Sequence, residues 1–118
     1  MELKEYQERA MTTCMPSSNN FSYMFLNLVG EVGEFASKVA KSIRKNESDI
    51  IRNDLFEKTK DNELLQKEAG DILWQLSGLC SVMGWSLEEI AQQNLDKLAA
   101  RKAVGTIDGS GDGIIRDK

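Results

Sequence analysis

Two acidic pairs, each set in an apolar helical segment, constrain this chain more than any other feature of its sequence. Glu31 and Glu34 lie three residues apart in FLNLVGEVGEFA, and Glu68 and Asp71 lie three residues apart in LLQKEAGDILW. Residues three apart on an α-helix share one face. Each pair therefore places two carboxylates on one side of a helix that is otherwise apolar.

Position around the helix indicates where these carboxylates point. At about 100° per residue, the first apolar stripe is centred near Leu28 and its acidic pair lies about 60° and 120° to one side. The second stripe is centred near Ile72, with its acidic pair about 40° and 100° off on the same side. The first stripe consists of Phe21, Phe25, Leu28, Val32, Phe35 and Val39. If the two helices pack antiparallel along these stripes, three or four carboxylates meet at one seam.

Such a gathering of negative charge needs compensation. Like charges about 4 Å apart repel by roughly 4 kcal/mol per pair at an effective dielectric constant near 20, so some carboxyl groups would protonate or turn outward. A divalent cation removes the repulsion, because Mg²⁺ and Mn²⁺ prefer oxygen ligands. Spacing alone supports two interpretations equally: a metal site, or four carboxylates at helix edges that reach water.

Composition limits the class of protein. A chain of 118 residues with 41% hydrophobic content fits one domain with a modest core. The net charge of -4 and the pI near 4.9 argue against a protein that coats a nucleic acid polymer, whereas a metal-bound nucleotide brings its own cation. The absence of histidine removes the commonest zinc ligand. Any metal is therefore expected to be bound by oxygen.

Two further observations concern the cellular compartment. No segment approaches the roughly 20 apolar residues of a membrane helix, and the first residues lack the pattern of a signal peptide. Cys14 and Cys80 have no framework spacing, and Cys80 is predicted to lie in the core. These observations predict a cytoplasmic protein with free thiols and no membrane contact.

Hydrophobic periodicity and capping residues predict four main helices. They cover residues 3–14, 21–44, 61–83 and 87–104. The run 17–20 offers an N-cap for the second helix, Gly84 ends the third, and Ser86 with Glu89 forms a capping box for the fourth. The sequence therefore predicts an all-α bundle.

The segments between and after the helices complete the predicted organisation. The polar connector over 46–61 is predicted to hold one short helical turn, and residues 105–118 form a glycine-rich tail after a helical domain over 1–104. A chain of this size with apolar helix faces in several directions often completes its core by oligomerising. Trp74, on such a second face, is interpreted as a subunit-interface residue in preference to a base-stacking one.

Some individual residues need a special reason for their positions. Gly30, Gly33 and Gly70 each cost about 1 kcal/mol in a helix interior relative to alanine, which predicts close approach of a neighbouring helix or ligand. Asn94 falls within an apolar stripe of the last helix and is expected to be buried and hydrogen-bonded. Lys38 follows Glu34 by one turn, which favours an ion pair over a phosphate contact.

The two acidic pairs carry a resemblance to a known family. The words LVGEVGE and EAGDILW, followed later by NLDKL, resemble the MazG family of all-α nucleoside triphosphate pyrophosphohydrolases over nearly the whole chain. One departure is the long gap of 33 residues, 35 to 67, between the acidic pairs. The resemblance implies a MazG-like bundle of four main helices that assembles as a homo-oligomer, either a dimer or a tetramer.

The resemblance also implies an activity and a set of site residues. The expected reaction is hydrolysis of a (d)NTP to its monophosphate and pyrophosphate, with Mg²⁺ (or Mn²⁺) as cofactor and cleansing of the nucleotide pool as the role. The expected metal ligands are Glu31, Glu34, Glu68 and Asp71, with Glu34 also the catalytic base. The expected substrate-binding residues are Lys38, Asn94, Lys97 and Arg101.

Two other interpretations stay open at this point. The first is a non-catalytic helical interaction module, in which the carboxylates are edge charges and the Trp74 face binds a partner. The second is a sister activity in the same superfamily, the hydrolysis of dUTP or of phosphoribosyl-ATP. Stabilisation by Mg²⁺ with nucleotide separates the first from the enzyme, and a substrate panel separates the second.

Overall fold

The computed structural model describes residues 1–45 and 60–105, and every regular element in them is helical. The elements are α1 (Leu3–Met11), a short 3₁₀ helix η1 (Pro16–Ser18), α2 (Phe21–Arg44), α3 (Lys60–Val82) and α4 (Leu87–Ala103). The prediction of an all-α chain with four main helices is therefore confirmed. The described part contains no helix that is long and apolar enough to cross a bilayer.

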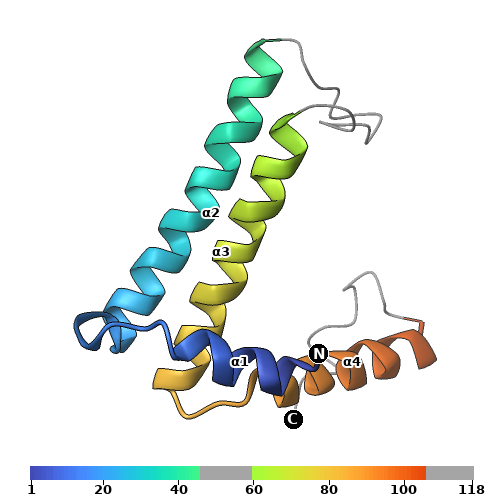
Figure 1. Ribbon diagram of the computed structural model, residues 1–118. Coiled ribbons are helices and arrows are strands. Elements are labelled where there is room, and N and C mark those ends of the chain that lie inside the picture. Colours follow the sequence, from blue (N-terminus) through green and yellow to red (C-terminus); the bar gives the residue numbers. More distant parts are fainter. Residues whose placement is uncertain (46–59, 106–118) are drawn as a thin grey trace.

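The two longest helices form an antiparallel hairpin. Helices α2 and α3 lie side by side along most of their length, and α1 crosses one end of this hairpin (Figure 1). Helix α4 packs chiefly against α1 and runs away from the hairpin (Figure 1). The described chain is thus a hairpin with a two-helix base rather than a closed bundle.

Local capping explains where the helices begin and end. Asn20 Oδ1 accepts a hydrogen bond from the backbone N–H of Tyr23 at 2.8 Å, and Ser86 Oγ accepts one from Glu89 N at 3.2 Å. Gly84 takes a left-handed φ of 73° after α3, which glycine adopts without steric cost. These predicted caps are confirmed.

Helix α1 ends at Met11, three residues before the predicted end. The hydroxyl groups of Thr12 and Thr13 donate to the carbonyl oxygens of Arg9 and Ala10, at 2.6 and 2.7 Å. Side chains of this kind compete with the backbone for helical carbonyls. The threonines therefore close the helix with their own side chains.

The core of the described chain is small. Met24, Cys80 and Leu87 are buried, which confirms the predicted core position of Cys80. The predicted stripe of α2 is not fully covered, because Phe21, Phe25 and Val32 are about half exposed. That part of the expectation is wrong for a single chain. The reason is that, within residues 1–45 and 60–105, α2 packs mainly on one neighbour, α3, which covers only part of its apolar face.

Hydrogen bonds from two polar side chains attach α1 to the rest of the molecule. Trp74 Nε1 donates to Ala10 O at 3.1 Å and to Thr13 Oγ1 at 3.0 Å. Gln7 Nε2 donates to Ser81 Oγ and Trp85 O, and Gln7 Oε1 accepts from Leu87 N, all at 2.9–3.0 Å. Trp74 therefore contacts α1 of its own chain, and its position in a subunit interface stays a prediction.

Two predictions concern segments outside the description. The predicted helical turn within 46–59 and the structure of the tail after residue 105 both lie outside the described residues. The division into a domain over 1–104 and a tail over 105–118 stays a prediction.

Candidate metal centre

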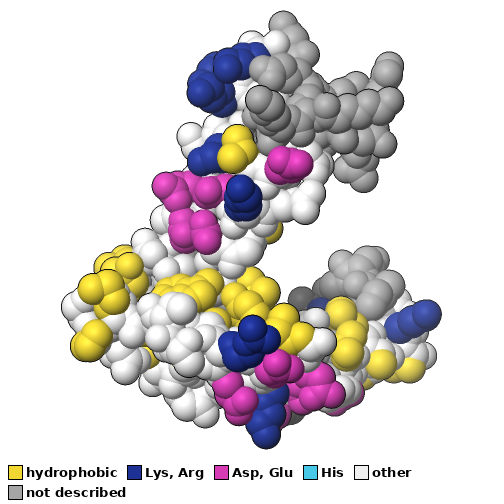
Figure 2. All heavy atoms as spheres, in the orientation of Figure 1, with side chains coloured by type: hydrophobic (Ala, Val, Ile, Leu, Met, Phe, Trp, Pro, Cys, Tyr) yellow, Lys and Arg dark blue, Asp and Glu magenta, His cyan; other side chains and the backbone are white. Residues whose placement is uncertain are grey.

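Three carboxylates from the two hairpin helices meet at one place. One oxygen each from Glu31 on α2 and from Glu68 and Asp71 on α3 lie within 4.8 Å of one another. The acidic side chains gather on one face midway along the hairpin, with basic side chains beside them (Figure 2). This convergence arises because the two i, i+3 pairs lie on the same side of their stripes and the helices are antiparallel.

Crowding of negative charge changes the proton affinity of one member. A hydrogen bond with Glu34, partial burial, and the charges of Glu34, Asp71 and Glu68 together raise the pKa of Glu31 to about 7. Near neutral pH the Glu31 carboxyl group therefore binds a proton for part of the time. A bound cation removes the need for that proton.

Glu68 places a buried carboxylate oxygen in this group. Its Oε1 is buried and has no hydrogen-bond partner in the described chain, although a buried polar atom without a partner costs about 1–3 kcal/mol. Its Oε2 lies 3.7 Å from Lys38 Nζ. An all-oxygen group with one unpartnered buried oxygen fits a hard divalent cation.

The remaining predicted acidic and basic residues of the hairpin lie at the edge of this group. Glu34 is exposed and is joined to the cluster through Glu31. Lys38 contacts Glu68 across the hairpin, whereas its sequence spacing had favoured Glu34. Helix packing brings α3 within its reach, which the spacing along α2 does not reveal.

The predicted substrate residues of α4 lie elsewhere in the chain. Asn94 and Lys97 are exposed and Arg101 is half-buried, on a helix that packs chiefly against α1. The expectation that Asn94 is buried in an apolar seam is wrong for the single chain, because Asn94 is exposed on a helix that, among the described residues, packs chiefly against α1. The fold of one chain does not bring these three residues to the carboxylates.

The glycines near the site have open space beside them. A Cβ added at Gly33 or Gly70 meets nothing within 4 Å, and one at Gly30 meets only Asn27 Oδ1 at 3.8 Å. The predicted close approach of a neighbouring helix is therefore wrong for these positions within one chain. The close approach occurs instead at Gly78, where an added Cβ would collide with the side chain of Met24.

Two residues beneath the carboxylates were not identified from the sequence. Asn27 Nδ2 donates to Gln75 Oε1 at 2.6 Å, one helical turn from Glu31 and from Asp71 respectively. The available signal in the sequence was that Asn27 lies four residues before Glu31 and Gln75 lies four residues after Asp71. A sequence pattern does not show that the two amides meet, because that depends on helix register.

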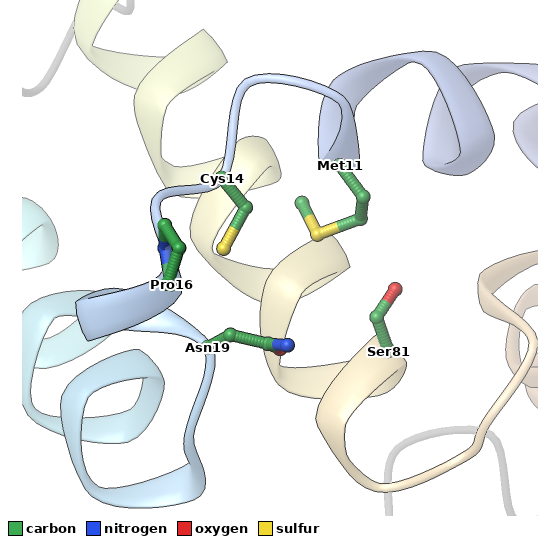
Figure 3. Close-up of a pocket in the computed structure, with 5 residues that line it drawn as sticks. All are labelled: Met11, Cys14, Pro16, Asn19 and Ser81. Carbon is green, nitrogen blue, oxygen red and sulfur yellow. The ribbon is translucent and has the colours of Figure 1, made fainter.

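Several cavities border α1, among them one beside Lys4, Gln7 and Trp85. Two others lie along the same helix. One, of about 550 Å³, is lined in part by Tyr6, Thr13 and Trp74. Burial and the nearby charge of Asp71 raise the pKa of Tyr6, one of these lining residues. The other, of about 450 Å³, is lined by Met11, Cys14, Pro16, Asn19 and Ser81, whose side chains converge in Figure 3. This second lining contains no carboxylate, so it offers no site for a hard cation.

Comparison with known proteins identifies the family. The sequence model of the MazG nucleotide pyrophosphohydrolase domain matches residues 19–105. The chain belongs to the MazG family. The match covers α2, α3, α4 and all four acidic positions of the two pairs, so the candidate metal centre lies within the MazG domain.

A curated relative supports the same assignment. The Gene 37 protein of Mycobacterium phage L5 is 38% identical over 96 residues, which cover 81% of this chain and 78% of that protein. Among solved structures there is no significant match. MazG domains are typically metal-dependent and act on nucleotides, and the carboxylate cluster is the part of this chain suited to hold a metal.

Proposed function

We propose that this MazG protein hydrolyses nucleoside triphosphates between the α and β phosphates, releasing a monophosphate and pyrophosphate. The observation that carries the proposal is the meeting of three carboxylates around the unpartnered Oε1 of Glu68 in a MazG domain. Deoxynucleotides or damaged nucleotides are the proposed substrate class, and cleansing of the nucleotide pool is the proposed role.

Glu31, Glu68 and Asp71 would hold Mg²⁺, with Mn²⁺ as an alternative ion. When bound, the ion supplies charge compensation for the phosphates and lowers the pKa of a water molecule. The carboxylates of the chain fix where the triphosphate lies relative to α2 and α3. Their approach within 4.8 Å suits ligands of a shared cation.

Glu34 is proposed as the proton acceptor. It lies at the exposed edge of the group, where a water molecule has access, and it forms a side-chain hydrogen bond with Glu31. A carboxylate in that position takes a proton from the attacking water without losing its place in the cluster. Lys38, beside Glu68, is proposed to turn from that carboxylate to a phosphate oxygen of the substrate.

The nucleoside is proposed to extend towards α1. Tyr6 and Trp74 line a cavity whose aromatic and hydroxyl groups suit a base and a sugar, and Tyr6 is close enough to Asp71 for the charge of that carboxylate to raise its pKa. Replacement of Tyr6 by alanine should raise KM for nucleotide and leave the affinity for Mn²⁺ alone unchanged. An unchanged KM would place the nucleoside elsewhere.

A second copy of the chain is proposed to complete the site. Leu26 and Val29 of α2 and Leu95 of α4 are more than half exposed, and apolar surface of this kind is typical of a subunit interface. Lys38 contacts the carboxylate cluster, but a triphosphate carries more negative charge than one ammonium group offsets, and Lys97 lies on the outward α4. If the α4 of a partner chain packed on the exposed face of α2, it would cover this apolar surface and bring a lysine to the phosphates.

One biochemical experiment tests the activity. The protein is incubated with NTPs, dNTPs, dUTP and phosphoribosyl-ATP in the presence of Mg²⁺, and pyrophosphate and orthophosphate are measured separately. Pyrophosphate release that is abolished by Glu68→Gln and retained by Glu63→Gln, an exposed glutamate of the same helix, supports the proposal. Orthophosphate release alone, or full activity of Glu68→Gln, would contradict it.

A mixing experiment tests the second copy. Light scattering should give at least a dimer, and Leu95→Lys should shift it to monomer. Glu68→Gln and Lys97→Met should each be inactive alone, and co-refolding equal amounts of them should restore about a quarter of the activity if each site combines two chains. Absence of any restoration in mixed oligomers would show that Lys97 serves its own chain or none.

A further inference from the structure

Side chains of α2 and α3 contact each other in successive layers between the base of the hairpin and the carboxylates. Met24 packs against Gly78, where there is no room for a Cβ. Asn27 lies three residues after Met24 on α2, and Gln75 lies three residues before Gly78 on α3. Asn27 Nδ2 donates a hydrogen bond to Gln75 Oε1 at 2.6 Å. Four residues further in each direction, Glu31 faces the acidic pair of α3. The amide pair is thus the layer directly beneath the metal centre.

The surroundings of Gln75 decide how this amide pair is oriented. Gln75 is only 3% exposed, and its Nε2 lies 3.5 Å from both the carbonyl oxygen and the sulfur of Met24. With its N–H groups turned to Met24, Gln75 presents Oε1 to Asn27. A buried amide that loses such a partner loses about 1–3 kcal/mol.

This pair distinguishes one helix register from the others. Contacts between apolar side chains are non-directional, so a hairpin held by them alone tolerates small axial slides and rotations. A buried hydrogen bond between two amides is made in one register and is broken in the rest, which is how single polar residues fix register in coiled coils. Asn27 and Gln75 occupy that position in this hairpin.

The metal centre depends on register more than the core does. A slide of one helical turn displaces a helix by about 5.4 Å, whereas a divalent cation needs its oxygen ligands at about 2.0–2.6 Å. We propose that Asn27 and Gln75 are a positioning pair, which holds α2 and α3 in the register where Glu31 meets Glu68 and Asp71. This inference rests on the proposed metal site.

The test compares three double variants of the full chain. Asn27→Leu with Gln75→Leu replaces the pair by apolar groups, a change that is close to neutral for stability when both partners are replaced together. Asn27→Gln with Gln75→Asn exchanges the amides and keeps a pair of the same total length. Asn62→Leu with Gln66→Leu is the matched control, because these amides also pair, within α3 and on its exposed side.

The measurements are the melting temperature of each metal-free variant and its Kd for Mn²⁺ by calorimetry. We expect the leucine pair at positions 27 and 75 to melt within a few degrees of the wild type and to bind Mn²⁺ about 10-fold or more weakly, the range for residues that orient metal ligands. The exchanged pair and the control should each have a Kd for Mn²⁺ within about threefold of the wild-type value, which is below that range.

The outcomes separate this inference from the function on which it rests. A wild-type Kd in the leucine pair overturns the positioning role alone, while a wild-type protein that binds no Mn²⁺ overturns the metal site and the positioning role together. If the leucine pair does not fold, Asn27→Ala replaces it in the comparison. The positioning role is supported if Asn27→Ala binds Mn²⁺ weakly while the exchanged pair binds it normally. Equal Mn²⁺ binding by these two variants overturns the positioning role.

Discussion

Lys38 of α2 faces Glu68 of α3 across the hairpin, with Nζ 3.7 Å from Oε2. An ammonium group of the chain therefore touches the carboxylate cluster on one side, while the other oxygen of Glu68 is buried and has no hydrogen-bond partner among the residues that the structure describes. The ammonium and a divalent cation would compete for the same carboxylate, whereas the ammonium and a triphosphate attract each other. This arrangement predicts opposite effects on two ligands.

Lys38→Met should tighten the binding of Mn²⁺ alone and weaken the binding of nucleotide. Mn²⁺ binds more tightly because the positive charge of Lys38 is removed from its neighbourhood. The triphosphate loses a charge-assisted contact with Lys38, which costs about 1.5–3 kcal/mol of binding free energy, or roughly a 10- to 100-fold rise in KM. Lys41→Met, at an exposed position one turn from the site, is the control. Calorimetry with Mn²⁺ and steady-state kinetics measure the two effects, and a parallel change in both affinities would contradict the assignment.

The raised pKa of Glu31 predicts how stability depends on pH. An acid with a pKa of about 7 in the folded chain, against an ordinary value of 4.5, binds its proton more tightly when folded. The free energy of unfolding of the metal-free protein should therefore fall as pH rises from about 4.5 to 7 and then level off. Thermal melts across this range measure the fall, and Glu31→Gln should reduce it.

Added Mg²⁺ should act in the opposite direction. A cation favours the ionised carboxylates, so the increase in melting temperature caused by Mg²⁺ should grow as pH rises towards and past 7. Melts with and without Mg²⁺ at each pH measure this increase. A stabilisation by Mg²⁺ that is independent of pH would show that the ion binds away from Glu31.

Gln7 is predicted to contribute to stability rather than to chemistry. Its amide makes three hydrogen bonds that join α1 to the segment between α3 and α4. Gln7→Leu leaves Leu87 N without its acceptor, so the free energy of unfolding should fall by about 1–3 kcal/mol. Urea titration measures this loss. KM for nucleotide should stay unchanged at temperatures where the variant is folded, and a selective rise in KM would instead make Gln7 a substrate contact.

The glycines of the hairpin should divide into two classes. Gly78→Ala forces its Cβ against Met24, and such overpacking typically costs about 1–3 kcal/mol. Gly33→Ala meets nothing within 4 Å and should stabilise the helix by about 1 kcal/mol through propensity alone. Equilibrium unfolding of both variants measures the contrast. A destabilised Gly33→Ala would indicate that a partner chain or ligand lies against this face.

Much of the fold is determined by local sequence. Periodicity and caps predict four helices because helix formation depends on neighbours three and four residues apart, and Asn20, Gly84 and Ser86 mark boundaries through bonds within a few residues. The end of α1 was missed because Thr12 and Thr13 close it with side-chain hydrogen bonds to its last turns, which periodicity does not detect.

By itself, the sequence determined which residue types are available and on which helix face they lie: paired carboxylates beside an apolar stripe, and no histidine. Only the tertiary structure decided which of them meet. It brought Glu31 to Glu68 and Asp71, turned Lys38 to α3, paired Asn27 with Gln75, and left α4 with its polar residues outside the hairpin. The physical reason is that faces follow from helical geometry within a segment, whereas contacts depend on the register and packing of helices far apart in the chain.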